Sequence, residues 1–161
     1  MIKKFNLFFI TFLNVGKIKF APGTIASLIT CLLFLLFLNI SNITIIFFGT
    51  LVISIYSFIA INSSFDYFDS NDPQEIVIDE VVGQMLPLLA IPIYETLYLV
   101  PKEYYCFFSF LLFRLFDIWK PFPINFIDKN TKGAFGIMLD DILAGIYTTF
   151  LLTLIFFFIG G

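Results

Sequence analysis

Long apolar runs, separated by short polar segments, dominate the pattern of the chain. Five of these runs approach the roughly 20 residues that a helix needs to cross a bilayer at about 1.5 Å per residue. They cover residues 25–40, 43–62, 81–100, 104–119 and 142–159. The second and fifth runs carry no charge, whereas the shorter fourth run contains Arg114 and Asp117. The pattern predicts an all-α integral membrane protein with four or five apolar helices.

Composition supports a membrane location. The chain has 161 residues, of which 60% are hydrophobic and only 13% are charged. One small water-soluble core could not bury this much apolar surface, so the excess is expected to face lipid. The length and the lack of a polar linker predict a single domain over residues 1–161. The net charge of −3 and the scattered basic residues argue against a nucleic-acid partner.

The first fifteen residues resemble a signal peptide in part. Lys3 and Lys4 precede an apolar run, but residues 13–16 offer no cleavage site of the small-x-small type. We therefore interpret residues 1–15 as an uncleaved helix that lies in the membrane interface.

Most charges fall in three short segments, at residues 19–28, 72–83 and 114–145. Two predicted crossings separate the first segment from the second, and two more separate the second from the third. All three segments are therefore expected at one membrane face. That face carries most of the basic residues, whereas the opposite turns carry Lys102 alone. The positive-inside rule predicts that the charged face lies in the cytoplasm.

Two pairs of adjacent acids, Asp79–Glu80 and Asp140–Asp141, stand where apolar helices are predicted to begin. A glycine follows each pair, at Gly83 and Gly145. Together with Asp117, the pairs bring up to five carboxylates to one face, and their mutual repulsion requires cations. The chain has no histidine, so oxygen ligation of Mg²⁺, or of Mn²⁺ as an alternative, is the predicted metal chemistry. The other interpretation is that each acid caps a helix or stays solvated.

Arg114, Asp117 and Lys120 follow one another at three-residue steps, along one side of a helix. They form either an intrahelical ladder of ion pairs or a site in which Asp117 binds metal while the two cations bind phosphate oxygens. Pro121 and Pro123 then end the helix.

Glycine-containing turns form the remaining candidate sites. Pro22, Gly23 and Thr24 lead into an apolar helix, where exposed amides and a hydroxyl suit an anion, although Thr24 by itself is also explained as a helix N-cap. Gly133 and Gly136 are either simple loop glycines or positions where the backbone approaches a phosphate.

Several other polar residues are assigned no chemistry. Asp66 and Asp69 lie in a polar loop and are expected to be solvated. Cys31 and Cys106 lie within apolar runs and are interpreted as buried, inert thiols.

Taken together, these segments resemble the phosphatidylglycerophosphatase A family of bacterial membrane lipid phosphatases. The resemblance covers residues 21–28, 76–92 and 113–146, and its most specific parts are FRLFDIWKPFPINFID and GIMLDDILAG. It implies Mg²⁺-dependent removal of the terminal phosphate from phosphatidylglycerophosphate, in the bacterial inner (cytoplasmic) membrane. The positions that match the acidic motifs of the family are Asp79, Glu80, Asp117, Asp140 and Asp141, with Arg114 and Lys120 beside them.

Two mechanisms fit this resemblance. In one, a metal-activated water attacks phosphorus while Arg114 and Lys120 stabilise charge on the phosphoryl oxygens. In the other, a carboxylate is the nucleophile. A function of a different class, a small ion or proton transporter, would use the acids to line a path. The placement of the charges at one end of the spans, with Glu95 alone well inside one, argues against transport.

Overall fold

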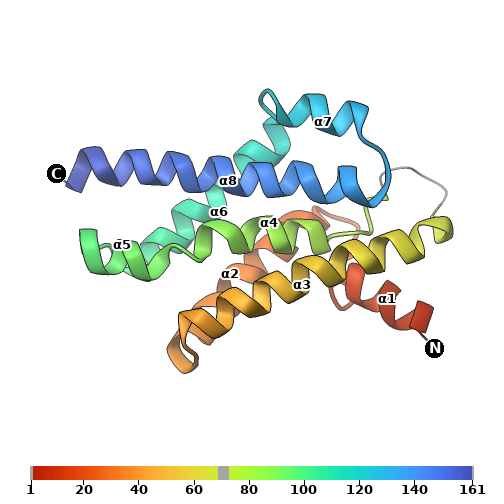
Figure 1. The fold of residues 1–161 in the computed structure, drawn as a ribbon, viewed down its shortest axis with the longest axis horizontal. Helices are drawn as coiled ribbons and strands as arrows, with labels where there is room; N and C mark the ends of the chain where they lie inside the picture. The colour runs from red at the N-terminus through yellow and green to blue at the C-terminus, as the bar shows by residue number, and fades with distance from the viewer. Residues whose placement is uncertain (1, 69–72, 161) are drawn as a thin grey trace.

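The computed structural model describes residues 2–68 and 73–160, and all the regular secondary structure in these residues is helical (Figure 1). The longer helices are α2 (Pro22–Ile40), α3 (Ile43–Ser64), α4 (Ile78–Leu88), α5 (Ile91–Tyr98), α6 (Lys102–Trp119) and α8 (Gly133–Gly160). The shorter ones are α1 (Ile2–Ile10), α7 (Ile124–Asn130) and two 3₁₀ turns, Val15–Lys17 and Phe65–Tyr67. The predicted all-α class is confirmed. Asp69 and Asp72 lie outside the described residues.

Four helical segments of the described chain are long and apolar enough to cross a membrane. They are Pro22–Ile40, Ile43–Tyr67, Ile78–Tyr98 and Gly133–Phe158. Large apolar side chains such as Leu36, Phe48 and Phe150 are more than half exposed on these helices. Apolar surface of this extent is stable against lipid rather than water, which agrees with a multi-helical membrane protein.

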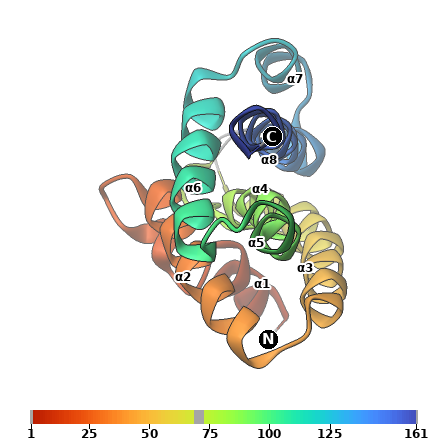
Figure 2. The same cartoon turned by 90° about the vertical axis from the view of Figure 1, so that its left-hand side faces the viewer.

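The fourth predicted run forms α6, which carries four charged residues and is more polar than the other spans. It packs against α2 and α8 along the bundle (Figure 2). Its C-terminal turn places Arg114 and Asp117 in the same cavity as the first turns of α2 and α4. The three charged segments therefore meet at one end of the bundle, as the predicted crossings require.

Two of the predicted spans differ clearly from the helices that form. The run predicted over residues 81–100 is divided into α4 and α5, because Pro87 and Pro92 lack the backbone donors that a continuous helix needs. The last run does not begin at Ile142, since α8 starts nine residues earlier at Gly133, whose φ is +76°. Asp140 consequently lies about two turns inside a helix and not at its end.

The backbones of helices α4 and α8 approach each other closely at Gly83 and Gly145. A Cβ atom on Gly83 would lie 2.6 Å from the carbonyl oxygen of Asp141, and one on Gly145 would overlap the carbonyl of Gly83. The two backbones therefore touch directly, as small residues allow in membrane helices. This contact explains the matching glycines of the two acidic segments.

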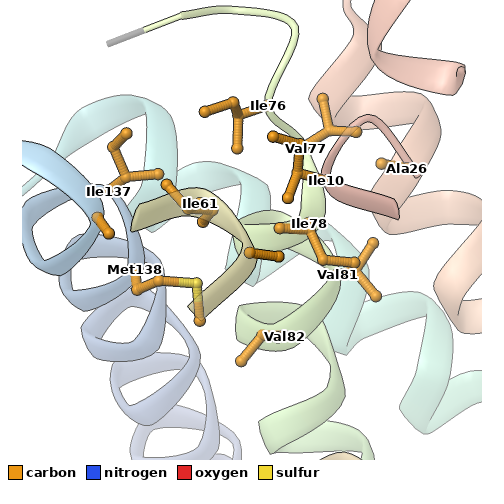
Figure 3. Packing of buried hydrophobic residues seen from close by; sticks show 12 residues of the cluster. Ile10, Ala26, Ile61, Ile76, Val77, Ile78, Val81, Val82, Ile137 and Met138 are labelled. Carbon is orange, nitrogen blue, oxygen red and sulfur yellow. The ribbon is translucent and has the colours of Figure 1, made fainter. Parts of the chain in front are cut away.

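A buried apolar cluster holds the N-terminal end of α4 in place (Figure 3). Val77, Ile78 and Val81 belong to this cluster together with Met138 of α8. The N–H of Val77 also donates a hydrogen bond of 3.0 Å to the carbonyl of Ile10, which ties α4 to the end of α1. The acids that follow Ile78 are thereby fixed relative to α8.

The expected N-terminal helix forms as α1 and packs on α3, but it ends at Ile10 instead of continuing to residue 15, since Phe12, Leu13 and Asn14 have positive φ angles. The side-chain amide of Asn6 donates to the Ser63 hydroxyl at 2.8 Å, and the Tyr56 hydroxyl donates to the Asn6 side-chain oxygen at 2.8 Å. Ile2, Phe5 and Phe8 remain exposed on the other side of α1, a pattern typical of an interfacial helix.

Candidate active site

A polar cavity of about 470 Å³ lies at the end of the bundle where the three charged segments meet. It is enclosed by the first turns of α2 and α4, the last turn of α6 and the second and third turns of α8. Ten of the twelve residues proposed from sequence line it: Pro22, Gly23, Thr24, Asp79, Glu80, Arg114, Asp117, Lys120, Asp140 and Asp141. The other two, Gly133 and Gly136, line an adjoining cavity of about 250 Å³.

Three carboxylates form the centre of this cavity. One oxygen each from Asp79, Glu80 and Asp141 lies within 4.8 Å of the others. The Asp79 and Asp141 residues are 9% and 3% exposed. Asp79 Oδ1, Glu80 Oε2 and Asp141 Oδ1 are buried and accept no hydrogen bond from the described residues. Buried anionic oxygens without donors are costly, so this set fits a hard divalent cation.

The local sequence explains how these carboxylates converge. Helix α4 begins at Ile78, so Asp79 and Glu80 occupy its first turn, where the helix dipole favours negative charge. The direct contact at Gly83 then brings Asp141 of α8 beside them. Gly23 completes the arrangement, because a side chain there would overlap the Glu80 carboxylate.

Arg114 and Asp117 form an ion pair on α6, with Arg114 Nη1 2.7 Å from Asp117 Oδ2. Both side chains are only 14% exposed. The first pair of the ion-pair ladder proposed from sequence, Arg114 with Asp117, is therefore present. Arg114 Nε is also buried and donates to no acceptor in the described residues. An unused guanidinium donor beside the carboxylate cluster suits a phosphate oxygen.

Lys120 does not continue the ladder. Its φ of +45° ends α6 in a left-handed cap and turns the side chain away from Asp117. Nζ instead lies 2.7 Å from Asp140 Oδ2 and 2.5 Å from Asp128 Oδ1. Burial would lower the pKa of Lys120, but these two carboxylates outweigh that effect and raise the pKa above its ordinary value. Lys120 is therefore a permanent cation at the rim of the cavity.

Asp128 is the residue that sequence reasoning missed. It lies on α7, a helix that the sequence did not predict, and it reaches Lys120 because the chain turns back after Pro121 and Pro123. Its position within the same charged motif, eight residues after Lys120, was the available signal.

Asp117 and Asp140 stand apart from the three-carboxylate cluster. Each faces the cavity, but Asp117 is paired with Arg114, and Asp140 with Lys120. The five acids predicted as one metal-binding set thus divide into two groups. Three have a buried oxygen that accepts no hydrogen bond, and two form ion pairs with Arg114 and Lys120. A direct bond from either of the two to a metal stays a prediction.

The glycine-containing turns have mainly backbone roles in the structure. The N-cap of α2 is Ala21, in a left-handed conformation, so the N-cap interpretation of Thr24 is wrong; Pro22 starts the helix, and Thr24 lies in its first turn. Amides in a first turn have no acceptor within the helix and can serve an anion. Gly136 fits against the carbonyl of Thr131, where a Cβ atom would clash.

Residues outside the cavity behave as expected. Cys31 and Cys106 are buried free thiols, and Asp66 is exposed. Neither cysteine lines the polar cavity.

Residues 8–156 of the chain match the family model described as phosphatidylglycerophosphatase A. The chain is 33% identical over 148 residues to a Bacteroides thetaiotaomicron protein that carries the provisional name phosphatidylinositol-3-phosphatase, covering 90% of this chain and 89% of that protein. It is 36% identical over 133 residues to phosphatidylglycerophosphatase A of Haemophilus influenzae, covering 82% and 77% of the two chains. The Escherichia coli protein of the same name is 37% identical over 90 residues, covering 56% and 46%. No solved structure matches the chain.

Proposed function

Because this chain belongs to the phosphatidylglycerophosphatase A family, we propose that it is a membrane lipid phosphatase that converts phosphatidylglycerophosphate to phosphatidylglycerol and phosphate. The observation that carries the proposal is the cluster of Asp79, Glu80 and Asp141, whose buried oxygens lack donors, beside the unused Arg114 donor. A cavity with both features can bind a dianionic phosphate through a cation and a guanidinium together.

Asp79, Glu80 and Asp141 would hold Mg²⁺, with Mn²⁺ as the alternative, since all their donor atoms are carboxylate oxygens. When bound, such an ion offsets the charge of the carboxylates and polarises a phosphoryl oxygen. Residues of the chain supply the other functions. Arg114 stabilises negative charge on the transferred phosphoryl group, and Asp117 holds the guanidinium in position.

Lys120 contributes a second positive charge at the rim of the cavity. Asp128 and Asp140 both accept hydrogen bonds from its ammonium group, which limits the positions that the group can adopt. Gly23 and Thr24 add first-turn backbone amides that can orient a phosphate oxygen. The acyl chains of the substrate remain in the bilayer, because the cavity lies at the end of the spanning helices.

The orientation follows from the distribution of basic residues. Lys19, Lys120, Lys129 and Lys132 all lie near the end of the bundle that holds the cavity. Lys102 lies at the opposite end, where it contacts Asn39. By the positive-inside rule this distribution supports an active end that faces the cytoplasm. The bacterial relatives support the inner membrane as the location.

A transport function receives no support from the described residues. Glu95, the acid expected within a span, is exposed on α5 and does not line either polar cavity at the active end. Apart from Glu103, which lies at the opposite end in the first turn of α6, the other described acids gather at the end that holds the cavity, so they do not form a path across the bundle.

Phosphate release from purified protein in detergent tests the proposal. The substrates are phosphatidylglycerophosphate, phosphatidate and phosphatidylinositol 3-phosphate at equal surface concentration, each with EDTA and after addition of Mg²⁺ or Mn²⁺. We expect phosphatidylglycerophosphate to be hydrolysed fastest, activity to vanish in EDTA and Mg²⁺ to restore it. Full turnover in metal-free buffer would refute the metal site, and preference for the inositol lipid would reassign the substrate.

A further inference from the structure

A second large cavity, of about 430 Å³, lies on the other side of the bundle between α1, α2, α3 and α4. Helices α2 and α3 form its sides. Ile78 and Val81 of α4 and Phe9 and Phe12 near the end of α1 complete the lining. We call this cavity the α2–α3 groove.

The α2–α3 groove offers almost no polar contacts. The hydroxyl of Thr30 donates to the Ala26 carbonyl at 2.8 Å, and that of Thr50 donates to the Ile46 carbonyl at 2.9 Å. Both hydroxyls are thus used by their own helices, and the other groove residues on α2 and α3, apart from Ser41, are apolar or glycine. An occupant must be apolar along its length.

The position of the groove indicates which apolar group fills it. Both α2 and α3 are candidate membrane spans, so the groove between them lies at the depth of the bilayer. Along α2 the lining runs from Thr30 to Ser41. At 1.5 Å per residue this is about 16 Å, or roughly half of the ~30 Å hydrocarbon core. The groove is therefore about as long as one leaflet is thick, and a single acyl chain spans that distance.

We propose that the α2–α3 groove binds one acyl chain of a membrane phospholipid. A protein helix of about 10 Å diameter is too wide for a cavity of about 430 Å³ between these four helices, whereas an acyl chain is slender and flexible enough to follow it.

The bound lipid is distinct from the substrate. The groove and the polar cavity have no lining residue in common, and α2 packs directly against α4 between them. An acyl chain in the groove contacts the same two helices whose first turns carry Gly23, Asp79 and Glu80. The bound lipid therefore stabilises the packing of α2 and α4 next to the site. This role does not depend on which lipid is hydrolysed.

Gly49 provides a direct test. It lines the groove, and a Cβ atom built there meets no other atom within 4 Å, so the ring of a Gly49→Phe variant can enter the groove without a backbone clash. Val52→Phe is the matched control, since Val52 lies on the same helix, is 65% exposed and does not line the groove. Gly49→Ala controls for the gain in helix propensity.

The first measurement is the Tm of lipid-depleted protein in detergent, before and after addition of phosphatidylglycerol. Long-chain phosphatidylglycerol should raise the Tm of wild type, Gly49→Ala and Val52→Phe, whereas dihexanoyl phosphatidylglycerol should not. Gly49→Phe should start from a higher Tm and lose most of the lipid-dependent shift. An equal shift in Gly49→Phe and Val52→Phe would overturn the proposal.

The second measurement maps photocrosslinks from phosphatidylglycerol that carries a diazirine in one acyl chain. Crosslinks should concentrate on the groove faces of α2 and α3 in wild type and Val52→Phe and disappear in Gly49→Phe. Crosslinks spread evenly over the lipid-facing surface, or a dimer that Gly49→Phe alone dissociates, would contradict the proposal. Neither measurement detects phosphate release, so failure here and failure of the proposed enzyme activity are distinguishable.

Discussion

The carboxylate of Glu80 occupies the space that a side chain on Gly23 would fill. Arg114 Nη1 lies only 3.4 Å from the same point. The first turn of α2, the acidic turn of α4 and the guanidinium of α6 therefore meet where one residue has no side chain. The site in this arrangement therefore requires glycine at position 23.

Gly23→Ala should reduce activity while leaving the fold intact. The methyl group would displace the end of the flexible Glu80 side chain and not the backbone, so helix packing should survive. A ligand displaced by about 1 Å can cost on the order of 100-fold in rate. Specific activity and Tm, measured on the same preparation, check this expectation. Normal activity would show that Glu80 does not need its present position.

Substitutions of the paired acids should separate the two groups of carboxylates. Asp79→Asn and Asp141→Asn remove charge from the cluster that lacks donors, so activity should fall by at least about 100-fold while Tm stays level or rises as repulsion is relieved. Asp140→Asn removes the negative charge that pairs with Lys120, so it should lower the stability by up to about 1 kcal/mol as well.

The same comparison needs a control acid. Asp66 is exposed on the 3₁₀ turn after α3, and Asp66→Asn should change neither the specific activity nor the Tm. If Asp79→Asn keeps near-normal specific activity, the cluster does not hold a catalytic metal.

The stabilising effect of Lys120 should depend on pH in a defined direction. Its pKa is raised in the folded state, so the stabilisation is fully present below the unfolded value of about 10.4 and is lost as the pH rises through the folded value. Lys120→Gln should therefore cost about 1 kcal/mol or less, by an amount that stays constant between roughly pH 6.5 and 9 and shrinks above roughly pH 10.4. Denaturation at several pH values measures this difference, and a loss that grows with pH would contradict the assignment.

Labelling of a single cysteine should report the orientation of the bundle. Asn130 is exposed at the end of α7, near the polar cavities. In a background without Cys31 and Cys106, Asn130→Cys should react with a membrane-impermeant thiol reagent after the cytoplasmic face has been opened. A cysteine at Glu103, near the opposite end of α6, should react in intact cells. The reverse pattern would invert the proposed topology.

The sequence by itself determined the membrane class, most of the spans and the residues that meet at the site. Apolar runs of span length cannot be buried in a small soluble core, and an even number of crossings must return the charged segments to one face. The family motifs are short contiguous stretches of sequence. Asp79, Glu80, Arg114 and Asp141 could therefore be identified without knowledge of the fold.

Only the tertiary structure decided how the charges are partnered. The left-handed backbone at Lys120 turns its ammonium to Asp128 and Asp140, a change of direction that helical periodicity does not predict. The contact between Gly83 and Gly145 selects Asp141 to join Asp79 and Glu80, because the approach of two backbones fixes which face of α8 points inward. The α2–α3 groove likewise depends on the angle between helices, which the apolar patterns of α2 and α3 do not contain.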